Sequence, residues 1–180
     1  MATIVALAGR RIDPPSAETT RFPARNIERV GRDIYQELKK QSARWLVSSA
    51  AAGADLLGVN AAINLGITPR IVLSPSVQEF ARMSVEDRGP YWIQEFKKAI
   101  SATAPDNISC IAAQPDMEDT FRSVNERILS DAIALSLSES AELVCFAVWD
   151  RVRRGKDDFS ADFVERAAGR GLPVIHINTV

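Results

Sequence analysis

The feature that most restricts how this chain can fold is a regular alternation of short apolar runs with longer amphipathic stretches. The apolar runs cover residues 3–8, 45–47, 70–73, 107–112, 143–149 and 174–177. The amphipathic stretches cover residues 26–40, 54–65, 76–83, 91–102, 118–138 and 160–168. The short runs are typical of strands in a parallel sheet, and the longer stretches are typical of helices that pack on one side. The pattern therefore predicts an α/β fold: a three-layer, doubly wound and mostly parallel sheet of about six strands, with helices on both faces.

Length and composition predict one domain that covers residues 1–180. A chain of 180 residues, 46% of them hydrophobic, can bury a core that needs no cross-links. The 22 basic and 23 acidic residues leave a net charge of −1, and the missing basic excess argues against nucleic acid as a partner. No run approaches the roughly 18 apolar residues of a membrane span, and the N-terminus lacks the basic start of a signal peptide. We therefore expect a cytoplasmic protein that does not bind membranes.

The chain holds little material for metal or redox chemistry. Cys110 and Cys145 both lie inside apolar runs and are expected to be buried, reduced thiols. His176 is the one histidine, and it lies in a strand-like run. Because zinc sites and histidine-based triads draw on Cys and His, we expect no metal ion and no cofactor.

The loop after the first predicted strand is the first candidate binding segment. Ligands of open α/β sheets bind beyond the carboxyl ends of the strands, and this loop begins Gly9-Arg10-Arg11-Ile12-Asp13. Gly9 would let the backbone approach a ligand closely. Arg10 and Arg11 carry bidentate donors suited to phosphate or carboxylate, with Asp13 beside them. The alternative is a surface loop with solvated arginines.

The junction after the second predicted strand is the next candidate. Ser48, Ser49 and Ala50 lead through small residues to Gly53 and Asp55, at the start of a helix. Free N–H groups and the helix dipole favour an anion there, although the motif is neither a Walker loop nor a Gly-x-Gly-x-x-Gly loop. Asp55 is expected either to cap the helix or to meet a ribose hydroxyl. We expect a bulky side chain at Gly53 to abolish ligand binding and leave the fold intact.

The charged segment after the fifth predicted strand is the third candidate. It runs from Trp149 and Asp150 through Gly155 to Ser160 and Asp162 at a helix N-terminus. Ser160 is a favoured N-cap residue, and Asp162 in the first turn is stabilised by the helix dipole. Capping alone explains both residues. The functional interpretation is a second helix end that faces a phosphate, with a carboxylate nearby.

Taken in order, these loops resemble the SLOG superfamily, the group that holds the LOG phosphoribohydrolases and the Smf/DprA proteins, and more closely its small bacterial members. The matching pieces are residues 8–13, 21–23, 48–55, Phe80 with Ser84-Val85, Asn125, 148–150 and 160–162. They span nearly the whole chain. The resemblance implies a Rossmann-like fold and a nucleotide-type ligand above the sheet, held around Gly9 and residues 48–53. Residues 155–162 would close its phosphate side.

The resemblance extends less well to catalysis. LOG enzymes cleave an N-glycosidic bond of a nucleoside monophosphate with a Pro-Gly-Gly-x-Gly-Thr-x-x-Glu motif and an upstream Arg. Here Phe159-Ser160 stands for Gly-Thr, and Phe163 stands where the Glu belongs. Asp162 is the nearest carboxylate, and Arg127 is the nearest match to the Arg. We therefore expect a sensor-type protein that binds a nucleotide or nucleotide-derived ligand; the alternative is an N-glycosidic-bond hydrolase or transferase that uses Asp162 and Arg127.

The predicted helix over residues 118–138 carries two apolar stripes. Leu129, Ile133 and Leu137 form the second of these stripes, so either another helix or a second subunit is expected to cover it. Because SLOG relatives often associate, the resemblance implies a homo-oligomer.

Overall fold

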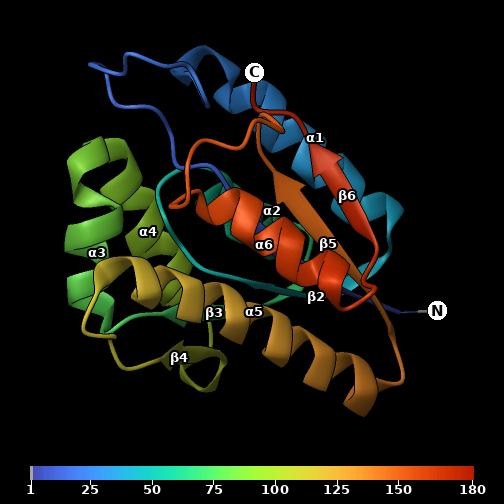
Figure 1. Ribbon diagram of the computed structural model, residues 1–180. Coiled ribbons are helices and arrows are strands. Elements are labelled where there is room, and N and C mark those ends of the chain that lie inside the picture. Colours follow the sequence, from blue (N-terminus) through green and yellow to red (C-terminus); the bar gives the residue numbers. More distant parts are fainter. Residues whose placement is uncertain (1) are drawn as a thin grey trace.

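The computed structural model describes residues 2–180 and confirms the predicted alternation (Figure 1). The strands are β1 (Thr3–Gly9), β2 (Ala43–Ser48), β3 (Thr68–Leu73), β4 (Ile108–Cys110), β5 (Glu142–Val148) and β6 (Val174–Ile177). The α-helices are α1 (Ile27–Lys40), α2 (Ala54–Asn64), α3 (Val77–Ser84), α4 (Pro90–Ala102), α5 (Met117–Glu139) and α6 (Phe159–Gly169). Short 3₁₀ turns are η1 (Ala24–Asn26), η2 (Glu86–Arg88) and η3 (Pro105–Asn107). The predicted fourth strand, over residues 107–112, is shorter than expected.

The six strands form one sheet in the order β4-β3-β2-β1-β5-β6, and each neighbouring pair is parallel. The chain builds outward from β1 through β2, β3 and β4, and then returns to place β5 on the other side of β1. The predicted three-layer, doubly wound, Rossmann-like fold is therefore confirmed. The strand order reverses between β1 and β5, and such a point opens a crevice at the carboxyl ends of the strands.

Helices cover both faces of the sheet, and β1 is therefore buried on both sides. Val5 and Leu7 pack in a core with α1, α2 and α4, whereas Ile4 and Ala6 pack in a second core with α5 and α6. This alternation follows the two-residue period of a strand. Figure 1 shows α5 and α6 in front of the sheet and α1 and α2 behind it.

Three details differ from the sequence-based expectations. Cys145 is buried, but Cys110 is exposed, because it ends the edge strand β4. Asp158, rather than Ser160, is the N-cap of α6, and its side chain accepts a hydrogen bond from the Ala161 amide. In the second stripe of α5, Leu129 lies in the core, but Leu137 is 76% exposed. The predicted homo-oligomer stays a prediction.

No helix within residues 2–180 is long and apolar enough to cross a membrane.

Candidate functional site

A cavity of about 620 Å³ opens at the carboxyl ends of β1 and β2, within the size range of small-molecule sites. Its lining comes from the loop after β1, the β2–α2 junction, the α3–η2 segment, and the facing parts of α5 and α6. The three predicted loops therefore converge on one cavity. The structure adds the α3–η2 segment and α5 to them.

The structure separates the predicted binding residues into two sets. Those that line the cavity are Gly9, Arg10, Arg11, Asp13, Ser49, Asp55 and Ser160. Those that lie outside its lining are Ser48, Ala50, Gly53, Trp149, Asp150 and Gly155. Lining residues that the sequence did not single out as binding residues include Arg21, Phe80, Ser84, Arg88, Phe121 and Asn125. Four of these stand in the motifs that carry the family resemblance, whereas Arg88 and Phe121 had no local signal.

Arg10 is held by two buried carboxylates from the segment that joins β5 to α6. Its Nη1 lies 2.6 Å from Asp158 Oδ1, and its Nε lies 3.1 Å from Asp150 Oδ1. Its guanidinium carbon also lies 5.6 Å from the Trp149 ring centre. Arg10 therefore joins the loop after β1 to the loop after β5 and shapes the cavity wall, with its donors already in use.

This ion-pair network shifts the pKa values of Arg10, Asp158 and Asp150 toward the charged form. For Arg10, burial opposes ionisation, but hydrogen bonds to Asp158 and Asp150 and their charges outweigh it and raise its pKa. For Asp158, burial also opposes ionisation, and the hydrogen bonds from Arg10 and the Ala161 and Arg154 amides outweigh it and lower the pKa. Asp150 has its pKa lowered in the same way by Arg154 and Arg10. The network is fully charged at neutral pH.

Asp55 lies in the middle of the cavity wall, at the start of α2. Its Oδ1 accepts a hydrogen bond from the Gly9 amide at 3.1 Å, and its Oδ2 accepts one from Ser49 Oγ at 2.5 Å. Burial raises the pKa of Asp55 to about 7, against the effect of these hydrogen bonds. Asp55 does not cap α2, because the N-cap is Gly53. Its carboxyl group accepts the hydrogen bond of the Gly9 amide, so that this amide is not free to donate to a ligand.

Gly53 is required by the close crossing of two loops. Its φ is +132°, and a Cβ added there would lie 2.5 Å from the Ile12 amide nitrogen and 2.6 Å from the Arg10 carbonyl oxygen. The backbones are joined at this point, because the Ile12 amide donates to the Ala52 carbonyl oxygen at 2.9 Å. The expectation that a bulky residue at Gly53 would spare the fold is therefore wrong.

The basic part of the cavity contains two arginines from distant segments. Arg11 and Arg88 both pair with the carboxylate of Asp87, and Arg88 Nε donates to the Ile12 carbonyl oxygen at 2.8 Å. Two residues that line the cavity, Arg11 and Ser84, each carry a buried side-chain atom, Nε and Oγ, that has no hydrogen-bond partner in the described part of the chain. Each is a donor whose hydrogen bond the described part of the chain leaves unmade.

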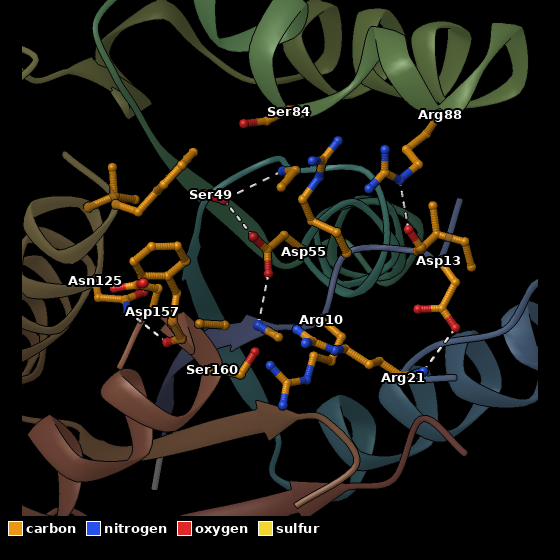
Figure 2. A pocket seen from close by; sticks show the side chains of 18 of the residues that line it. Arg10, Asp13, Arg21, Ser49, Asp55, Ser84, Arg88, Asn125, Asp157 and Ser160 are labelled. Carbon is orange, nitrogen blue, oxygen red and sulfur yellow. Dashed lines mark hydrogen bonds between the residues drawn. The ribbon is translucent and has the colours of Figure 1, made fainter. Parts of the chain in front are cut away.

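The opposite part of the cavity holds aromatic and aliphatic side chains beside Asn125 and Asp157. Phe121 of α5 and Phe159 of α6 have ring centres 5.1 Å apart, with Val124 and Ile128 beside them. Figure 2 shows Asn125 at this end, Arg21 and Arg88 at the other, and Asp55 between. The cavity thus offers an apolar end for a flat ring and a cationic end for an anion.

Asp162 and Arg127, the residues expected to act in catalysis, lie outside the lining of this cavity. Asp162 Oδ2 accepts hydrogen bonds from Asn125 Nδ2 at 2.9 Å and Arg166 Nε at 2.8 Å. Arg127 Nε donates to Asp131 Oδ1 at 2.7 Å along α5. Both side chains therefore hold helices together or lie on the helix surface.

No protein-family model and no curated protein matches this sequence. Among solved structures, the chain is similar to the X-ray structure of DNA processing protein A (DprA) from Streptococcus pneumoniae, with a TM-score of 0.41 and 12% sequence identity. The similarity covers 97% of this chain and 57% of the DprA chain, so this chain spans little more than half of that protein's length.

Proposed function

We propose that the cavity binds a nucleotide or a nucleotide-derived ligand. The observation that carries this proposal is that two residues lining the same cavity, Arg11 and Ser84, each hold a buried donor, Nε and Oγ, without a partner. A buried polar group without a partner costs about 1–3 kcal/mol. A ligand with acceptor atoms would recover that energy on binding.

The distribution of side chains around the cavity supports a ligand with three chemically different parts. Phe121 and Phe159 suit the flat face of a base. Ser49 and Asp55 suit sugar hydroxyls, and Arg11 suits a phosphate. The volume of about 620 Å³ leaves room for a ligand of this size.

A thermal-shift screen against a nucleotide library tests the proposal. A ligand present at a hundred times its dissociation constant stabilises the folded protein by about 2.7 kcal/mol. Ser84→Ala should lower the affinity for that ligand by about threefold to tenfold, because one hydrogen bond is lost. Ser109 supplies a matched control, since its Oγ is also buried without a partner but lies outside the cavity lining.

The proposal fails if no nucleotide raises the melting temperature, or if Ser84→Ala and Ser109→Ala bind the ligand equally well. Melting temperatures of both variants without ligand show that each is folded.

One observation favours the alternative, cleavage of an N-glycosidic bond. Asp55 lines the cavity and has a pKa of about 7, which suits a group that exchanges protons near neutral pH. Incubation with nucleoside monophosphates, followed by chromatography for free base, tests this reaction. Base release that disappears in Asp55→Asn and persists in Asp162→Asn would support it, and the absence of free base would exclude it for those substrates.

A further inference from the structure

The α3–η2 segment supplies the cavity lining with Ser84 and Arg88 and places the Asp87 carboxylate against two of the lining arginines. Ser84 ends α3, lines the cavity and is 1% exposed, and its Oγ has no hydrogen-bond partner in the described part of the chain. Three residues later, Asp87 shares its carboxylate between the Arg11 and Arg88 guanidinium groups. Figure 2 shows Ser84 and Arg88 on the same side of the cavity.

The two arginines form an anion site by their arrangement. Burial, and then the nearby positive charge of Arg88, lower the pKa of Arg11. Two like charges held close together repel each other, and an anion beside them stabilises the charged form of both. Asp87 supplies a single negative charge to both arginines, and it leaves Arg11 Nε without a partner. Charge and hydrogen bonding at this point are therefore only partly satisfied by the protein.

Asp87 is held in a way that permits its displacement. Its side chain is 46% exposed, whereas that of Arg88 is 15% exposed. Arg88 is also fixed by its bond to the Ile12 carbonyl oxygen. An exposed ion pair contributes about 0.2–1 kcal/mol, so a competing anion needs little energy to move the Asp87 carboxylate into solvent.

We propose that Arg11, Arg88 and Ser84 form the subsite for a phosphate group of the ligand, and that the Asp87 carboxylate occupies this subsite until the phosphate displaces it. The inference rests on the proposed function for the rest of the ligand. Asp87 then sets how strongly the cavity prefers a phosphorylated ligand over its unphosphorylated form.

The test titrates inorganic phosphate into the full chain and follows the amide signals of the η2 turn by NMR. Asp87→Asn removes the competing charge, so it should bind phosphate about fivefold more tightly than wild type. Asp106→Asn makes the same change of net charge on the exposed turn η3 and should bind phosphate as the wild type does. Arg11→Gln should lose phosphate binding.

Phosphate affinity in Asp87→Asn that equals or falls below that in Asp106→Asn would overturn the inference, because Asp87 would then only position the arginines. The absence of phosphate binding in every variant would overturn it as well. This result is separable from the proposed function. If nucleotides bind with the same affinity to Asp87→Asn and Asp106→Asn, only the phosphate subsite is refuted. If phosphate binds more tightly to Asp87→Asn but no nucleotide binds, only the proposal that the cavity binds a nucleotide is refuted.

Discussion

Replacing Asp55 with Asn should remove a large pH dependence from the stability of this protein. Burial raises the pKa of Asp55 from 3.8 to about 7. Between those values the folded protein holds a proton that the unfolded chain has lost. The free energy of unfolding of the wild type therefore falls as the pH rises from about 4 to 7.

The size of the effect follows from the pKa difference of roughly three units. Each unit corresponds to about 1.36 kcal/mol, so the wild type should lose about 4 kcal/mol relative to Asp55→Asn across this range. The Asn side chain can still accept the hydrogen bond from the Gly9 amide, but it carries no charge at any pH. Relative to the wild type, the free energy of unfolding of the variant should therefore be highest at pH 8, where the buried Asp55 of the wild type is ionised.

Urea unfolding, followed by the fluorescence of the three tryptophans, measures the part of this effect that falls between pH 5 and pH 8, which is about 3 kcal/mol. The lowered pKa values of Asp150 and Asp158 act equally in both proteins, so they cancel in the difference between wild type and variant. Asp106→Asn, at an exposed position, should follow the wild type. A difference between wild type and Asp55→Asn that is the same at pH 5 and pH 8 would refute the reasoning.

Three further predictions follow from the packing. Asp158→Ala leaves Arg10 buried without its closest partner and should lower the free energy of unfolding, measured in urea, by about 3–5 kcal/mol. The wild type should lose this contribution below about pH 4, as Asp158 protonates. A loss under 1 kcal/mol in Asp158→Ala would contradict this prediction. Gly53→Ala should lower the melting temperature more than Gly66→Ala, because both have a positive φ but only Gly53 meets backbone atoms; equal losses would show that the loop crossing relaxes. Ellman's reagent should modify one thiol quickly and none in Cys110→Ser, because the other cysteine is buried and burial raises its pKa to about 12; rapid modification of both thiols would be inconsistent with the fold.

The two neighbouring arginines after β1 show where inference from the sequence reaches its limit. Arg10 and Arg11 have the same chemistry and adjacent positions, and both were predicted to contact a ligand. Arg10 is instead held by Asp150 and Asp158, which lie 140 and 148 residues away in the sequence. Arg11 lines the cavity and keeps a buried nitrogen without a hydrogen-bond partner in the described part of the chain. Only the distant partners distinguish the two residues.

The sequence by itself determined the order of strands and helices, most of their bounds, and the loops that meet at the carboxyl end of the sheet. Those properties depend on the spacing of apolar residues along a few turns of chain, and this spacing is local. Tertiary structure alone decided that the Asp55 carboxyl, rather than a ligand, accepts the Gly9 amide, and that the α3–η2 segment brings Ser84 and Arg88 to the cavity. These outcomes depend on contacts between segments far apart in the chain, for which hydrophobic periodicity carries no signal.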